Sequence, residues 1–303
     1  LVFLVLPVGM LLVQSVYDPM GKGWLGLSQF RAYFGEARLM ATLFNSLGVA
    51  VATAVAATSL GTVYAYALIR TRMPWRGWFR QIALLPLYAP SMLFGIGLVF
   101  LFGEKGLITN EEFGLLGGLV SLPVYGPVGI TLAMVMFTFP IALLVMVVAL
   151  GKSDQRLFDA AVALGAGPWR RLWTVTLPAC RFGLVSALLM TFTLAFTDFG
   201  VPMMLPSKDF QVLAVEVYKQ VVNNQNNAMG ATVSIVLLVP AVAAFAVDRV
   251  IQGRQVANVR VGSVTFSPRP GRWRDRTVTA LCLLICVALL AVVLAPLLVA
   301  FVD

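Results

Sequence analysis

Four long stretches of the chain contain no charged residue, and they constrain its fold more than any other feature. They are Leu43–Ile69, Gln81–Gly103, Pro127–Leu150 and Thr277–Val302. Each is long enough to cross the hydrocarbon core of a bilayer, which takes about 20 apolar residues as a helix. Three less uniform runs are further candidates, namely Leu1–Tyr17, Phe182–Thr197 and Ala228–Val247. With 60% hydrophobic and 12% charged residues, the sequence predicts an all-α membrane protein, a polytopic helix bundle.

The positions of lysine and arginine predict how the spans are oriented. If the first loop (18–41) lies outside, 16 of the 22 basic residues fall on the opposite side. Short cytoplasmic loops carry such an excess of positive charge, so we expect segment 152–181 to be cytoplasmic and the chain to be a multi-pass protein of the bacterial inner membrane. The net charge of +9 is then explained by basic residues that keep loops on the cytoplasmic side. We therefore expect the protein to interact with the lipid bilayer and not with nucleic acid.

The order of these runs predicts three parts. Residues 1–250 hold six spans. Residues 251–276 contain "SPRPGR" and several arginines, a composition typical of a linker, which we expect to be cytoplasmic. Residues 277–303 start a seventh span, which we interpret as the first span of a second, truncated unit. Because the chain begins inside an apolar run, we expect it to be part of a longer polypeptide.

The segment 151–178 between the fourth and fifth spans has a different pattern. Leu157, Ala160, Ala161 and Leu164 recur at helical spacing, and Gly165 is placed to end that helix in a left-handed conformation. Pro168 suits the first position of a second helix, which we expect to run until Leu177-Pro178 turns the chain into the next span. The physics leaves two interpretations open, an interfacial loop anchored by tryptophans and arginines or a docking element.

The residues of this segment resemble a known motif. Asp159-Ala160-Ala161, Gly165, Val175 and Leu177-Pro178 are similar in type and spacing to the cytoplasmic "EAA" loop in permease subunits of binding-protein-dependent ABC importers. Asp for Glu at 159 and Val for Ile at 175 are mild departures. The resemblance extends over most of residues 1–250.

This resemblance implies the fold of a type I ABC importer transmembrane domain and a coupling loop that docks on a separate ATPase. It implies three kinds of protein partner: ATPase subunits, an extracytoplasmic solute-binding protein, and a second permease unit in the same chain or another. It also implies that this chain needs no cofactor and that ATP is bound by the ATPase partner. The chain is then not an enzyme.

The chemistry absent from the sequence agrees with this interpretation. No GxxxxGK[ST] phosphate loop occurs, and the chain has no histidine, so it offers neither a nucleotide site of that type nor a Ser-His or Cys-His pair. Cys282 and Cys286 share a helix face but are too few ligands for a metal, and we predict no metal site.

Candidates for the solute path are few because the spans hold almost no ionisable group. A carboxylate near membrane depth is a functional candidate, which points to Asp198 at the outer end of the fifth span, although an Asp that caps a helix is equally consistent. Asn45 and Ser46 in the second span are the other candidates for lining the path.

The stretch from "TDFGVP" to "AFAVDR" is most similar to permeases for 2-aminoethylphosphonate, and this resemblance implies that solute. Ferric-iron and polyamine importers are alternatives that share the looser "DFG" pattern. From a different class, a secondary transporter or channel without an ATPase also fits a polytopic bundle.

Overall fold

The computed structural model describes residues 2–18, 23–109, 123–151, 155–257 and 271–302. Its long helices, in chain order, are α1 (Val2–Val16), α3 (Ala37–Arg70), α6 (Pro127–Gly151), α9 (Leu177–Thr197), α12 (Asn227–Ala257) and α13 (Arg272–Val302). The shorter ones are α2 (Ser28–Gly35), α4 (Arg76–Leu84), α5 (Ser91–Phe102), α7 (Gln155–Ala163), α8 (Pro168–Arg171), α10 (Gly200–Met204) and α11 (Leu213–Tyr218). Two-residue strands β1 (Tyr17–Asp18) and β2 (Gly23–Trp24) pair antiparallel.

The prediction of an all-α membrane bundle is confirmed. Among the described residues, five helices are long and apolar enough to span a membrane, or six if one bent pair is counted as a span. At 15 residues, α1 is shorter than a full span.

The third predicted span, Gln81–Gly103, is a broken helix in the structure. The chain forms α4, a short 3₁₀ helix (Leu85–Tyr88) and α5, and the pair is bent by 105°. Pro86 and Pro90 explain the break, because proline lacks the N–H that an α-helix needs, and Pro90 takes an extended conformation just before α5.

The fifth span departs from expectation in the opposite sense. We expected Leu177-Pro178 to turn the chain, but one helix runs from Pro168 to Thr197. A π-helical segment, Leu172–Thr176, joins α8 to α9. The Leu177 N–H donates to the Leu172 carbonyl across this segment, a wider turn that leaves Pro178 inside one continuous helix.

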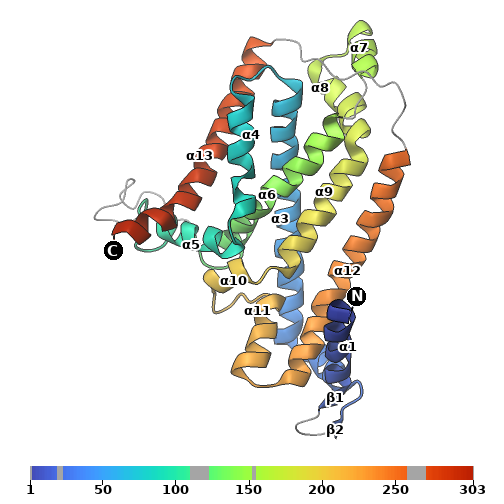
Figure 1. Ribbon diagram of the computed structural model, residues 1–303, viewed down its shortest axis with the longest axis vertical. Coiled ribbons are helices and arrows are strands. Elements are labelled where there is room, and N and C mark those ends of the chain that lie inside the picture. Colours follow the sequence, from blue (N-terminus) through green and yellow to red (C-terminus); the bar gives the residue numbers. More distant parts are fainter. Residues whose placement is uncertain (1, 19–22, 110–122, 152–154, 258–270, 303) are drawn as a thin grey trace.

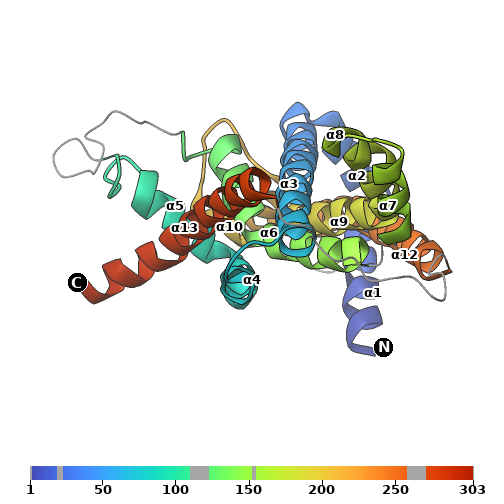
Figure 2. The ribbon, with the colours of Figure 1, turned by 90° about the horizontal axis from the view of Figure 1, so that it is seen from above.

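The centre of the bundle is α3, which packs along α6 and α9, while α9 also packs against α12. Figure 1 shows α7 and α8 at one end of these helices and α11 toward the other. Viewed along the bundle in Figure 2, α5 and α13 lie on one flank, and α1 and α12 lie on the other. The absence of a side chain at Gly61 allows α3 and α6 to pack closely, because a Cβ on Gly61 would lie 2.9 Å from the backbone nitrogen of Leu143.

The helix that follows the predicted linker packs against this same bundle. α13 contacts α3, α4 and α5, and the Tyr64 hydroxyl lies 3.1 Å from the Cys286 sulfur while donating to the Phe79 carbonyl at 2.8 Å. The first and last residues of the predicted linker, 251–276, belong to helices, because α12 continues to Ala257 and α13 begins at Arg272. Its middle part, 258–270, lies outside the described residues.

Candidate functional site

The segment with the EAA-like pattern forms a helical corner at one end of the bundle. α7 ends as predicted at Gly165, whose φ of +75° lies in the left-handed region. The Gly165 N–H donates to the Val162 carbonyl at 2.9 Å, and the Ala166 N–H donates to the Ala161 carbonyl at 3.0 Å. These two bonds define a Schellman motif, so the sequence sets the corner through its glycine.

The second half of the corner begins as the sequence predicts. Gly167 precedes Pro168, which occupies the start of α8, where its missing N–H costs no helical hydrogen bond. Helix α8 then continues into α9 without interruption. Helix α7 is therefore joined to one end of a spanning helix through a corner of only a few residues.

α7 presents an apolar face that none of the other described residues covers. Leu157 and Leu164 are 55% and 86% exposed, and Ala160 between them is exposed as well. Ala161 is half-buried, so the two alanines of the motif face different surroundings. The two exposed leucines lie about two helical turns apart, and the small side chain between them leaves room for another protein surface to approach closely.

The other motif residues lie inside the corner or along the helix that follows it. Asp159 is half-buried, and its Oδ2 accepts a hydrogen bond from Gln155 Nε2 at 3.3 Å. Val175 and Leu177 are half-buried in the π segment and the start of α9, and Pro178 is exposed. The corner thus has a solvent-facing side on α7 and an inner side against the bundle.

Directly beside the corner lies an open groove of about 730 Å³ between α3 and the α8–α9 helix. Its α3 wall carries four hydroxyl groups, on Thr58, Ser59, Thr62 and Tyr66, and its other wall carries Trp169 and Trp173. No carboxylate lines it among the described residues. The sequence reasoning missed these hydroxyls. Their signal was present as hydroxyl residues at helical spacing inside an uncharged run.

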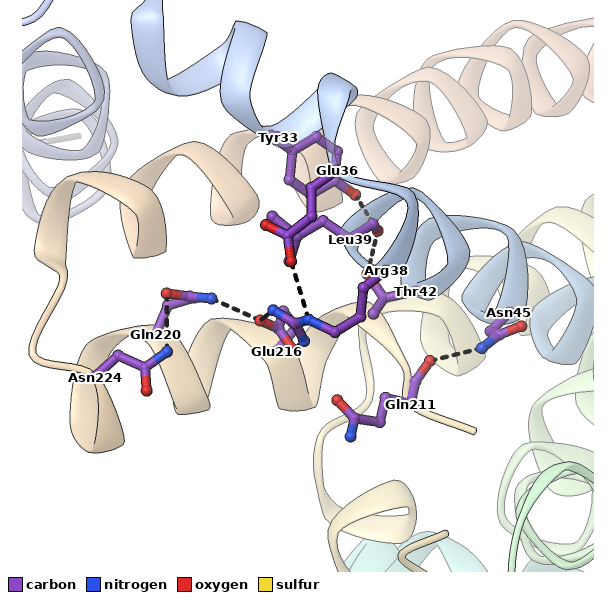
Figure 3. A network of polar contacts seen from close by, with 10 residues as sticks. All are labelled: Tyr33, Glu36, Arg38, Leu39, Thr42, Asn45, Gln211, Glu216, Gln220 and Asn224. Carbon is purple, nitrogen blue, oxygen red and sulfur yellow. Dashed lines mark hydrogen bonds and ion pairs between the residues drawn. The ribbon is translucent and has the colours of Figure 1, made fainter. Parts of the chain in front are cut away.

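The three residues predicted for the solute path do not line this groove. Asn45 and Ser46 hold the segment before α11 against α3. The Asn45 amide donates to the Gln211 carbonyl at 3.0 Å, and the Ser46 hydroxyl accepts from the Leu213 N–H at 2.7 Å. Figure 3 shows Asn45 and Gln211 in this arrangement. Both predicted residues are therefore engaged in holding the outer loop.

Asp198 lies between α9 and α10. Its Oδ2 accepts a hydrogen bond from the Val201 N–H at 2.9 Å, the bond made by a residue that caps a helix start. Burial raises the pKa of the Asp198 carboxyl above its ordinary value, although hydrogen bonds from Val201 and Ser91 act in the opposite direction. The capping alternative has direct geometric support, and contact with solute stays a prediction.

The sequence reasoning missed an ion pair that joins the N-terminal end of α3 to α11. Both terminal nitrogens of the Arg38 guanidinium bond the Glu216 carboxylate, at 3.0 and 3.1 Å, and Gln220 adds a third bond at 2.7 Å (Figure 3). Burial alone would raise the pKa of Glu216, but the bonds from Arg38 and Gln220 outweigh it and hold that pKa below its ordinary value. Separated by 178 residues, this pair gives no local sequence signal.

Comparison with known proteins adds the following. The family model described as "Binding-protein-dependent transport system inner membrane component" matches residues 57–256. A protein named as a 2-aminoethylphosphonate transport system permease, PhnU of Salmonella typhi, is 22% identical over 82% of this chain and 86% of its own length. The ferric transport system permease protein FbpB of Actinobacillus pleuropneumoniae is 25% identical over 81% of this chain, and the match spans 35% of FbpB.

A third relative and a solved structure agree on the general class. The molybdenum transport system permease protein ModB of Azotobacter vinelandii is 30% identical over 60% of this chain and 80% of its length. A chain of a bacterial ABC transporter involved in the import of the acidic polysaccharide alginate has a similar fold, with a TM-score of 0.65 at 15% identity, covering 86% of this chain and 92% of that one.

Proposed function

Because the chain belongs to the family of inner membrane components of binding-protein-dependent transport systems, we propose that it passes the movement of a separate ATPase to its spans through α7. The chain is a multi-pass permease of an ABC importer. The observation that carries the proposal is the uncovered apolar face of α7 on a rigid glycine corner whose second helix runs without a break into α9.

The mechanism follows from that continuity. The Schellman bonds at Gly165 hold α7 at a set angle to α8 and α9. A protein that binds Leu157, Ala160 and Leu164 and then moves can therefore move α9 with it. Such a partner shifts the bundle between two arrangements only if it binds one of them more tightly. ATP binding and hydrolysis in the partner supply that difference, and this chain needs no cofactor of its own.

On the opposite side of the membrane we propose a solute-binding protein as the second partner, and a second permease unit beside this one. Two findings support the first: the family description, and the similar fold of a bacterial alginate ABC transporter solved in complex with an alginate pentasaccharide-bound periplasmic protein. The match spans about a third of FbpB, a longer protein that has room for a further unit of this size.

The solute path is proposed to include the groove between α3 and α9. Its hydroxyl groups can exchange hydrogen bonds with a polar solute, and it lies directly beside the corner. We propose 2-aminoethylphosphonate as the solute, with ferric iron as the alternative, on the strength of the likeness to PhnU and FbpB.

Charge reversal on α7 tests the coupling proposal. In the permease reconstituted with its ATPase and binding protein, Asp159→Lys should weaken ATPase association and ATP-dependent uptake of 2-aminoethylphosphonate. Asp209→Lys is the matched control, because Asp209 is an exposed carboxylate outside the corner. Normal ATPase association and uptake in Asp159→Lys would contradict the coupling role. Uptake that needs no ATPase at all would favour a secondary transporter or channel.

A further inference from the structure

The inner side of α7 carries one aromatic ring, Phe158, whose neighbours come from two other helices. The guanidinium carbon of Arg171, the last residue of α8, lies 4.9 Å from the ring centroid, and that of Arg70, the last residue of α3, lies 5.8 Å from it. Both distances fall within the range of cation–π attraction, which is about 6 Å. Three helices therefore converge on a single ring.

The burial of the participants distinguishes this cluster from a surface contact. Arg70 is only 3% exposed, and Phe158 and Arg171 are both half-buried. A cation–π contact is stronger where water is excluded. On the same helix, Leu157 and Leu164 point into solvent. α7 thus has one face open to a partner and one ring held against the bundle.

The two arginines lead to different parts of the fold. Arg171 continues through the π segment into α9, so the ring's contact with it braces the corner itself. Arg70 ends α3, the helix that packs along both α6 and α9. The chain between Arg70 and α7 passes through α4, α5 and α6. Besides the packing of α3 on α6 and α9, the contact between Phe158 and Arg70 is therefore a direct link from α7 to the end of α3.

We propose that Phe158 is a positioning residue that ties the end of α3 to α7, so that a displacement of α7 moves α3 and α9 together. This inference rests on the proposed coupling function and adds a second route to it. Without the ring, α7 would still move α9 through the corner, and α3 would lag behind. The distance between α3 and α9 across the groove would then change, whereas it stays the same when the two helices move together.

The test uses the full permease assembled with its ATPase, and it needs no solute. Spin labels replace Val63 on α3 and Val185 on α9, which are about 40% exposed, while the native cysteines are buried. The distance between the labels is measured without nucleotide and after trapping with ATP and vanadate. In the wild-type sequence the pair should keep its distance, because both helices move as one unit.

Phe158→Leu removes the ring and keeps an apolar side chain, and Phe158→Tyr keeps the ring. We expect the leucine variant to bind the ATPase as the wild type does, within about twofold, but to change its label distance on trapping by about 1–2 Å, the scale of helix shifts in such transitions. The fraction of trapped assemblies that keep the wild-type label distance should fall about fivefold. This ratio corresponds to ~1 kcal/mol, the strength of one cation–π contact. The tyrosine variant should behave as the wild type.

The matched control is Phe182→Leu. Phe182 lies 4.8 Å from the Arg181 guanidinium carbon, a contact of the same kind between neighbouring residues on α9, and it bridges no helices. It should leave the label distance unchanged. Arg70→Gln and Arg70→Lys provide a second pair if Phe158→Leu does not fold, because the first removes the cation that ends α3 and the second keeps one.

Three results would overturn the inference: a Phe158→Leu distance change equal to that of the wild type, a tyrosine variant as impaired as the leucine one, or an equal effect of Phe182→Leu. A wild-type permease that does not bind the ATPase at all would refute the coupling function itself. The two failures are therefore distinguishable.

Discussion

Replacing Gly165 by alanine isolates what the left-handed corner contributes. A Cβ at this position would meet no atom within 4 Å, so the substitution creates no clash. Its cost is confined to the backbone, because a residue with a side chain pays about 1–2 kcal/mol to hold a φ of +75°. The substitution therefore weakens the corner without altering the exposed leucines of α7.

The expected result is a weaker complex with the ATPase. If α7 leaves its docked angle in proportion to that cost, affinity should fall about fivefold to thirtyfold, since 1.4 kcal/mol corresponds to a factor of ten. Gly165→Asn should lose less, because asparagine tolerates the left-handed region better than alanine. The measurement is equilibrium binding of the purified ATPase to the permease in nanodiscs.

Gly167→Ala provides the matched control two residues further on. Its φ is −66°, which any residue adopts, and a Cβ there also has open space. It should bind the ATPase like the wild type. Equal losses in Gly165→Ala and Gly167→Ala would refute the argument, because the loss would then come from an added methyl group and not from backbone conformation.

Three further predictions concern stability, measured as unfolding of the purified protein in detergent. Glu216→Gln should cost about 1–2 kcal/mol, less than a fully buried pair because Arg38 is 51% exposed. Since the folded-state pKa of Glu216 lies below its ordinary 4.5, this stabilisation should be complete above about pH 4.5 and be lost as the pH falls through the folded-state pKa; a difference that does not shrink in acid would contradict it. Asp248→Leu should cost about 1–3 kcal/mol, because it leaves a buried hydroxyl and an amide without their acceptor, and Asp248→Asn should cost less; equal costs would argue against the hydrogen bonds. Gly61→Ala should destabilise by about 1–3 kcal/mol through its clash with the α6 backbone, whereas Gly48→Ala, with nothing within 4 Å, should be neutral or stabilising; similar effects would indicate that α3 and α6 are not so closely packed.

The helical corner formed by α7 and α8 was predictable because its signals are local. Helical spacing from Leu157 to Leu164, a glycine at the C-terminal end and Pro168 at the next helix start each act within a few residues. The structure confirms the left-handed glycine and the helix start at proline. It overturns the expected turn at Leu177-Pro178, because a π segment holds the proline within one continuous helix, and short-range patterns do not distinguish that outcome from a break.

The solute-path candidates were harder to predict because their roles depend on distant partners. Asn45 and Ser46 bond a segment more than 160 residues away. Arg38 and Glu216 form a bidentate pair across a similar distance. The hydroxyls of the α3–α9 groove become a wall only when two helices pack side by side.

The sequence by itself determined the class of the fold, the approximate spans and the corner, because the length of apolar runs and the conformational limits of glycine and proline act locally along the chain. Only the tertiary structure decided which faces of those helices meet. Phe158 shows the difference: its sequence neighbours say that it lies on a helix, but the two guanidinium groups around it come from residues 70 and 171. Long-range packing follows from the mutual fit of many side chains, and no short stretch of sequence specifies that fit.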